Sequence, residues 1–537
     1  MTAVVKDICM PFYLDEREFI PRELKRRGIS CSSYKIARAA VDARKAPEVR
    51  FVYTVLCEIS SGSLPTGEKA EIFEKEDYPA SVPEASSFKS GYRPVVVGFG
   101  PCGIFCTLLL AEKGFRPIVL ERGDDCKKRK TKAEAYFAGG ALDTESNVQF
   151  GEGGAGAFSD GKLMTRISDK RCSFVMDTLV RFGAPGEISY LARPHVGTDR
   201  LSGIVENIRN EIIRLGGEVR FGARLDGMER TKNGTYALSA GGAVFETDAV
   251  FIASGHSAVD TVEMLRRFGA DVRAKDFSLG FRIEHKRLDV ERSVYKGAIF
   301  HEKAYKLPAA EYNVSYRKGA KGVYSFCMCP GGVVVPSESE NGTIVTNGMS
   351  FFARDGENSN CAIAVSVNGS DHGGSVERAL KIKTDMERAA FLLGNGKAPC
   401  QSAGSFIRGE KPYISDAIRP TYARKTHCAD TAALFTHEQS ALLREGLSYF
   451  GRSFEFFKDE NAPITAPETR TSSPVRVMRS PETLVAVTSG GSELPGIYPC
   501  GEGAGYAGGI TSAACDGLRC AEAYIFSKRR IFLTSGY

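Results

Sequence analysis

The sequence predicts an α/β fold: a three-layer domain around a parallel sheet, interrupted by a mixed α+β domain and preceded by a small α/β module. Three observations favour it. The 537 residues exceed what one ordinary core accommodates, so two or three domains are expected. Residues 93–122 have the pattern of a strand, a glycine-rich turn, a helix and a second strand. A strand, a glycine-rich loop and a helix return at residues 484–530, which predicts that two distant segments share one domain.

The composition excludes several classes of protein. Hydrophobic residues make up 42% and charged residues 25%, which is ordinary globular usage. The net charge of +6 is small for this length, so we expect no nucleic-acid partner. The first fifteen residues carry Lys6, Asp7 and Asp15 and lack a long apolar core, unlike a secretory leader. The 15 scattered cysteines are therefore expected to be free thiols in the cytoplasm.

One apolar stretch, Val95–Ala111, has a composition that a membrane span would also show. It is short for a span and contains three glycines and a proline. A buried strand that runs into a buried helix explains it better, so we expect no membrane association.

The remaining segments set the expected domain boundaries. Residues 1–88 are predicted to form a small α/β module and linker, in which Pro21 begins a short helix and Gly28 ends it. Residues 49–59 are rich in β-branched and aromatic types and are predicted to form a strand. The sheet domain is expected to comprise 93–160, 200–255 and 484–530, and the substrate or cap domain 161–199 and 260–483.

The first motif, Val95–Gly103, joins a β-branched strand to the pattern GxGxxG. Gly98 permits a tight turn, Gly100 lets the backbone approach a pyrophosphate, and Gly103 lets the following helix pack on the strand. Glu121 ends the second strand, 23 residues after Gly98, where an acid binds ribose hydroxyls. This pattern predicts a Rossmann-type dinucleotide domain that binds an unphosphorylated adenosine ribose, as in FAD or NAD.

The second motif, Gly496–Ile510, distinguishes these two cofactors. FAD is long, so the chain must return to hold its ribitol and its ring system. A strand that ends in Gly501-Glu502 can place a carboxylate on a ribitol hydroxyl, and the glycines that follow let the backbone lie against the ring. The helix after Gly509 would aim its positive end at the O2 edge of the flavin. An enzyme that binds only NAD needs no such second clamp, so FAD is the expected cofactor.

The third motif, Asn147–Lys162, is dense in glycine and is expected to cross the pyrophosphate or the flavin edge; the alternative is a flexible surface loop. The residues expected to contact FAD are Gly98, Gly100, Pro101, Gly103, Glu121, Arg122, Gly153, Gly154, Ala155, Gly156, Leu225, Ser254, Gly255, Gly501, Glu502, Gly505, Gly508, Gly509 and Ile510.

These motifs together resemble a bacterial family of FAD-dependent dehydrogenases of unassigned substrate, within the flavoproteins that have a glutathione-reductase-type FAD domain. The resemblance covers residues 93–530, and the N-terminal module resembles the small leader of that family. It rests on GFGPCG, NVQFGEGGAGAFSDGKL, SFCMCPGG, ETRTSSPVR and YPCGEGAGYAGGITSAACDGL. One departure is Ala157, where the family is expected to carry threonine. The resemblance implies FAD and a redox reaction, and it supplies no substrate.

Five residues are candidates for catalysis. Cys327 and Cys329 form a close pair that is either two buried thiols in a tight turn, a thiol that reacts, or a pair of metal ligands; no second pair has zinc-ligand spacing, so no metal is expected. His256 follows a predicted strand end near the cofactor, or has only a structural role. Arg470 and Arg476 lie in a Thr/Ser/Pro loop and would clamp a carboxylate, unless they form ordinary salt bridges.

The leading hypothesis is an FAD-dependent oxidoreductase that transfers a hydride or an electron pair between flavin N5 and a small, anionic substrate. The sequence has no second strand-linked GxGxxG, so electrons come from the substrate or from NAD(P)H bound without its own Rossmann fold. The alternative is a flavoprotein whose FAD is structural or regulatory and which acts as a scaffold for RNA or protein.

Overall fold

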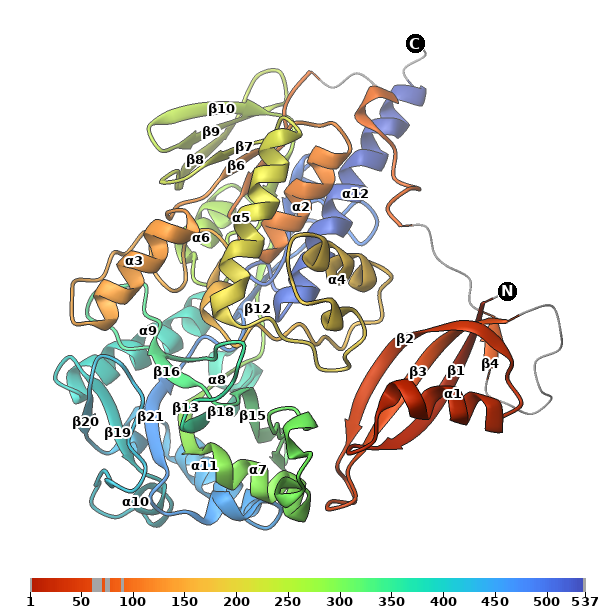
Figure 1. Ribbon diagram of the computed structural model, residues 1–537. Helices are drawn as coiled ribbons and strands as arrows, with labels where there is room; N and C mark the ends of the chain where they lie inside the picture. The colour runs from red at the N-terminus through yellow and green to blue at the C-terminus, as the bar shows by residue number, and fades with distance from the viewer. Residues whose placement is uncertain (1, 60–69, 73–77, 88–90, 535–537) are drawn as a thin grey trace.

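The computed structural model describes residues 2–59, 70–72, 78–87 and 91–534, and it has the predicted α/β architecture (Figure 1). A small N-terminal module lies beside a larger body. Within that body a domain with a parallel sheet and its helices adjoins a second domain with a mixed sheet.

The N-terminal module is a four-stranded antiparallel sheet in the order β2-β3-β1-β4, covered on one face by α1. Helix α1 (Glu16–Arg26) begins where Asp15 accepts a hydrogen bond from Arg17 N, and it buries Ile20 and Leu24. The prediction that Pro21 begins this helix was wrong, because the Asp15 cap starts it earlier and Pro21 lies inside. The strands are β1 (Thr2–Pro11), β2 (Cys31–Asp42), β3 (Arg50–Ile59) and β4 (Ala70–Ile72).

The central sheet of the larger body has five parallel strands in the order β23-β11-β5-β6-β7. Its strands are β5 (Val95–Val97), β6 (Ile118–Leu120), β7 (Glu218–Arg220), β11 (Val250–Ile252) and β23 (Ile497–Pro499). Val95 and Val97 face one apolar core and Val96 faces another, because successive side chains alternate between the faces of a strand. Burial on both faces explains why these strands are continuous apolar runs.

Helices cover one face of this sheet, and a small antiparallel sheet with α6 (Val259–Arg267) covers the other, which completes three layers (Figure 1). The helical layer contains α2 (Pro101–Glu112), α4 (Arg171–Arg181), α5 (Thr198–Arg214) and α12 (Ile510–Thr534). The small sheet contains β8 (Leu225–Arg230), β9 (Tyr236–Ala240) and β10 (Ala243–Thr247). Helix α3 (Cys126–Phe137) follows β6.

Helix α4 lies in the segment 161–199, which the sequence analysis assigned to the cap domain. Val175, Leu179 and Ile188 instead belong to the core that α2 and α12 form on the central sheet. The predicted domain boundary at residue 161 is therefore misplaced, because α4 belongs to the domain of the central sheet. It buries its apolar face on α12, which lies more than 300 residues later in the chain.

The second domain is built on a seven-stranded mixed sheet in the order β14-β15-β18-β13-β21-β19-β20. Leu279 and Phe281 of its central strand share one core with Leu443 and Leu447 of α11 (His437–Phe450). The strands are β13 (Phe277–Lys286), β14 (Ser315–Lys318), β15 (Lys321–Cys329), β18 (Asn358–Val367), β19 (Ala398–Ser402), β20 (Thr426–Cys428) and β21 (Pro463–Glu468).

Shorter elements complete this domain. Its further helices are α7 (Arg287–Tyr295), α8 (Gly369–His372), α9 (Val376–Leu393) and α10 (Ala403–Arg408). A hairpin consists of β16 (Val333–Pro336) and β17 (Thr346–Met349), and a two-stranded ladder joins β12 (Val272–Ala274) to β22 (Val475–Val477). Among the residues that the structure describes, none of the helices combines the length and apolar character needed to cross a membrane.

Candidate functional site

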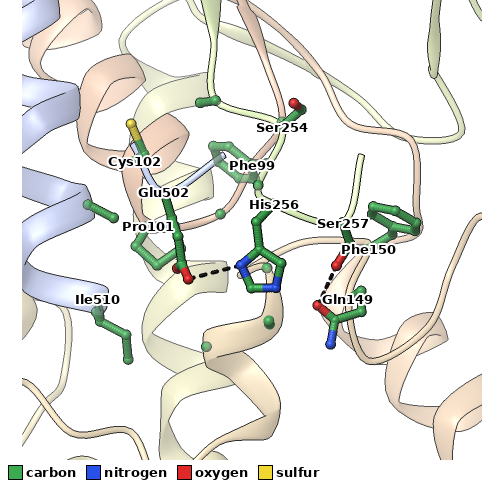
Figure 2. A pocket seen from close by; sticks show the side chains of 18 of the residues that line it. Phe99, Pro101, Cys102, Gln149, Phe150, Ser254, His256, Ser257, Glu502 and Ile510 are labelled. Carbon is green, nitrogen blue, oxygen red and sulfur yellow. Dashed lines mark hydrogen bonds and ion pairs between the residues drawn. The ribbon is translucent and has the colours of Figure 1, made fainter. Parts of the chain in front are cut away.

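One cavity of about 310 Å³ lies at the carboxyl ends of β5, β6 and β11, beside the first turns of α2 and α12. The carboxyl edge of a parallel sheet is where ligands of α/β proteins bind. Phe326, Cys327, Asn347 and Arg470 of the second domain line the same cavity. The cavity therefore has a wall from each domain, and Figure 2 shows part of its lining.

The GxGxxG turn fits the backbone so closely that side chains would collide. Gly98 has a φ of 94°, and a Cβ there would lie 2.6 Å from Ala253 O. A Cβ on Gly103 would lie 2.0 Å from Gly98 O, so this glycine serves the packing of α2 and does not line the cavity. Gly100 caps α2 without a side-chain hydrogen bond, which leaves the N–H groups of the first turn available for an anion.

The glycine-rich loop crosses this turn. A Cβ on Gly154 would lie 3.0 Å from Gly100 Cα, so the two backbones meet almost directly. Gly154, Ala155 and Gly156 line the cavity, whereas Gly153 lies behind them and donates its N–H to Phe99 O at 2.9 Å.

A buried arginine holds this loop in place. Arg129 of α3 is 1% exposed. Its guanidinium donates to the carbonyls of Asn147 at 2.8 Å, Val148 at 2.9 Å and Glu152 at 2.6 Å. The cost of burying the charge, which lowers the pKa of Arg129 to about 10, is thus offset by hydrogen bonds to the loop.

Glu121 was expected to bind the ribose hydroxyls, and the structure gives its carboxylate a larger role. Oε2 accepts from Phe99 N at 2.7 Å, and Oε1 accepts from Gly123 N and Gly151 N, each at 2.9 Å. A carboxylate has about four acceptor positions, so roughly one remains for a hydroxyl of the ligand. Glu121 therefore joins the turn, the end of β6 and the glycine-rich loop, in addition to lining the cavity.

The C-terminal clamp brings Glu502 against His256 (Figure 2). His256 Nδ1 lies 2.9 Å from Glu502 Oε1, and both residues line the cavity together with Gly508, Gly509 and Ile510 at the start of α12. Gly501 and Gly505 do not line it. They fix the clamp instead, because Gly501 N donates to Asp516 Oδ2 at 2.8 Å and Gly505 N donates to Glu502 O at 2.9 Å.

His256 presents an acceptor to the cavity. A carboxylate can only accept, so Nδ1 carries the proton that faces Glu502. Burial lowers the pKa of His256, although Glu502 opposes this, and the neutral ring then has a lone pair on Nε2. Nε2 is buried and has no hydrogen-bond partner among the described residues. The orphaned atom matches a hydroxyl or proton donor of a bound ligand.

The other expected cofactor residues meet at the same place. Arg122 lies over the ring of Phe150, 4.3 Å from its centroid, and donates to Asp260 at 2.8 Å. Those that line the cavity with it are Pro101, Leu225, Ser254 and Gly255.

Three of the five catalytic candidates have contacts within the protein instead, and for Arg470 this is the salt bridge that the sequence left open as the alternative. Arg470 lines the cavity, but its Nε and Nη2 each donate to Glu387 at 2.9 Å and its Nη1 to Ser257 Oγ at 2.6 Å. The predicted carboxylate clamp is thus already filled by Glu387. Arg476 is exposed, lies outside the cavity and donates to the carbonyl of Gly505. Cys329 is fully buried and lies behind Cys327, which does line the cavity.

Sequence reasoning missed several polar residues of the cavity wall. Lys162 and Asp160 end the third motif, and their charge after a glycine-rich run was the signal that could have identified them. Asn347 lies in β17, which carries no motif. Gln149 accepts from Ser257 Oγ at 2.9 Å across the cavity rim (Figure 2).

Comparisons with known proteins agree with a flavoprotein. The family model described as "FAD-dependent protein, C-terminal domain-like" matches residues 276–471. An uncharacterized protein of Clostridium beijerinckii is 43% identical over 515 residues, which cover 94% of each chain.

Solved structures share less with this chain. Halogenase PltM is 10% identical with a TM-score of 0.39, over 82% of this chain and 70% of that one. CtdE in complex with FAD is 10% identical with a TM-score of 0.32, over 83% and 90%. Similarity at this level does not transfer a function.

Proposed function

The chain belongs to the same family as the Clostridium beijerinckii protein, and it carries the C-terminal domain of FAD-dependent proteins. From this we propose its function. FAD is the cofactor. The proposed activity is that of an oxidoreductase that moves a hydride or an electron pair between the flavin and a small organic substrate.

The residues of the cavity fit FAD on features of this chain alone. The uncapped first turn of α2 suits the pyrophosphate, and the remaining acceptor position of Glu121 suits one ribose hydroxyl. Glu502, His256 Nε2 and the start of α12 would hold the ribitol and the ring end. When bound, FAD supplies an acceptor and donor of electron pairs.

One observation supports an enzyme over a scaffold most directly. The cavity that would hold the cofactor continues to a wall from the second domain, where Cys327, Lys162 and Asn347 gather. A structural cofactor needs no such polar chamber, whereas a substrate must meet polar groups beside the flavin. These residues would bind and orient the substrate and move its protons.

Electrons would come from the substrate or from NAD(P)H. The test is an anaerobic screen in which the flavin absorbance is followed with NADH, NADPH and a set of small organic acids. We expect at least one of them to bleach the flavin. If dithionite bleaches the flavin and none of these donors does, and if the photoreduced protein reoxidises slowly whatever acceptor is added, the scaffold alternative replaces this proposal.

A further inference from the structure

Cys327 owes its position at the cavity to a bulge in β15. The pairing of β15 with β18 passes from Phe326↔Ala362 to Cys329↔Asn360, so one extra residue is accommodated on β15. Cys327 has a φ of 46°, a left-handed conformation that is uncommon for a residue with a side chain. Bulges redirect side chains next to functional sites, and this one places Cys327 in the cavity wall.

Cations surround the bulge. Lys162 Nζ donates to Met328 O at 2.5 Å, next to Cys327. Arg282 is fully buried and donates from Nη1 to Cys327 O at 2.7 Å, and the same nitrogen lies 4.0 Å from Cys329 Sγ. Lys162 comes from the end of the glycine-rich loop and Arg282 comes from β13, so two separate segments hold the bulge.

Cations and carboxylates form one cluster around the bulge. Glu311 lies 3.4 Å from Lys162, 3.0 Å from Arg354 and 3.6 Å from Arg193. Arg354 also pairs with Asp160. In the part of the chain that the structure describes, the largely buried cations Lys162, Arg282 and Arg354 are matched by the carboxylates Asp160, Glu311 and Glu468, whereas Arg193 is half exposed. Lys162 and Arg282 are the cations that contact the bulge itself, and both would stabilise a thiolate on Cys327.

The thiol and phenol groups nearest to Cys327 stay neutral. A hydrogen bond to Cys327, together with burial, raises the pKa of the Cys329 thiol well above its usual range. Burial raises the pKa of Cys361 to about 12 and raises the pKa of Tyr312 well above its usual range. For Cys327, the hydrogen bond from Cys329 and the charges of Arg282 and Lys162 outweigh burial and lower the pKa of the thiol below its usual range. The contacts of Lys162 and Arg282 with the bulge and these pKa shifts thus agree that Cys327 is the thiol that ionises.

Asn347 provides a hydrogen-bond donor in the same wall. Its Oδ1 accepts from Arg282 Nη2 at 2.9 Å and from Gly348 N at 2.8 Å, and because an arginine can only donate, this fixes which side of the amide is oxygen. The Nδ2 group is therefore on the opposite side, and Asn347 lines the cavity. Arg282 donates both to Cys327 O and to Asn347 Oδ1, so one guanidinium holds the two residues in the same wall, and a neutral donor there suits the oxygen of a carbonyl group.

We propose that Cys327 is a thiolate that accepts a proton from a substrate carbon next to a carbonyl group, with Asn347 Nδ2 binding the carbonyl oxygen. The substrate C–H bond breaks, the proton forms an S–H bond on Sγ, and the electron pair stays on the substrate as an enolate that Asn347 stabilises. Lys162 is the counter-cation of the thiolate. This inference rests on the proposed function, since it assigns that cavity a carbonyl substrate.

The first test measures ionisation and needs no substrate. The FAD-loaded protein is treated with iodoacetamide at several pH values, and modification of each cysteine is followed by peptide mass spectrometry. Cys428 is exposed and serves as an internal reference. At pH 6, a larger fraction of Cys327 than of Cys428 is thiolate, which speeds its alkylation. A more acidic thiol is also a weaker nucleophile, which offsets part of this gain. Together these effects predict that Cys327 is alkylated about tenfold faster than Cys428. Alkylation no faster than that of Cys428 would overturn the thiolate.

The second test changes the counter-cation. In Lys162→Met, the pH at which Cys327 alkylation is half-maximal should rise by about one unit, because the thiolate loses a nearby positive charge. Lys162→Arg keeps the charge and should keep the profile of the native protein. The same pH profile in all three proteins would remove Lys162 from the proposal.

The third test separates carbonyl binding from a structural effect. In Asn347→Ala, iodoacetamide, which has a carbonyl oxygen, should react about fivefold more slowly with Cys327, as expected for one lost hydrogen bond. Methyl methanethiosulfonate, which has none, should react at an unchanged rate. An equal fall with both reagents would overturn the role of Asn347. These alkylation rates do not depend on electron transfer. If they are as expected but no donor bleaches the flavin, the oxidoreductase activity is refuted and the thiolate is not.

Discussion

Replacing Glu121 should damage the fold of the site more than its direct contact with FAD. In Glu121→Ala, the N–H groups of Phe99, Gly123 and Gly151 all lose the carboxylate that accepts from them. Hydrogen bonds to a charged group contribute about 1.5–3 kcal/mol each, so the loss is at least about 4 kcal/mol. For a domain of this size that corresponds to a melting temperature lower by roughly 10 °C.

The assay is thermal unfolding of the FAD-free protein, followed by measurement of FAD affinity. Glu121→Gln keeps one acceptor oxygen, so its melting temperature should lie between those of the native protein and Glu121→Ala. Glu229→Gln, an exposed glutamate on β8, is the matched control and should be unchanged. The one remaining acceptor position limits the direct loss of FAD affinity to roughly tenfold to a hundredfold. An FAD-free Glu121→Ala protein as stable as the native one would refute the reasoning.

Two further predictions concern buried side chains. Arg129→Met removes the donor to three loop carbonyls and should lower the melting temperature and speed FAD release, measured by thermal unfolding and by flavin fluorescence after dilution. His285 is packed between Phe456 and Phe457, and burial lowers its pKa to about 3. As the pH falls below about 6.5, only the unfolded chain takes up a proton on this histidine. His285 should therefore lower the free energy of unfolding, measured in urea, by about 2 kcal/mol between pH 7.5 and pH 5. In His285→Phe this difference should disappear.

Local patterns predicted the strand, turn and helix beside the cavity correctly. Val95–Gly103 gives strand, turn and helix because every step of that pattern is set by neighbouring residues: β-branched side chains favour the strand and missing side chains permit the turn. The return of the chain at Ile510 was predicted for the same reason, since a glycine pair precedes an apolar helix.

Long-range partners account for what the sequence did not predict. Nothing near Arg470 in the sequence indicates that Glu387 fills its guanidinium, and nothing near Glu121 indicates that three backbone groups already occupy its carboxylate. No local motif marks Asn347, because the residue that orients its side chain is Arg282, 65 residues earlier in the chain. Pairing across a fold depends on packing that local propensity does not contain.

The flavin content of the native protein and of Gly100→Val tests whether the cavity at the GxGxxG turn binds FAD. Gly100 has an ordinary φ of −80°, and a Cβ there would be in normal contact with Gly154 Cα at 3.6 Å, so the backbone at this position accepts a side chain. Its side chain would nevertheless stand where the pyrophosphate approaches the turn. We expect denaturation to release one FAD, and no FMN, per native chain, and the variant to contain none. A native protein that is colourless and takes up no added FAD, or a variant that binds FAD as the native protein does, would contradict the account.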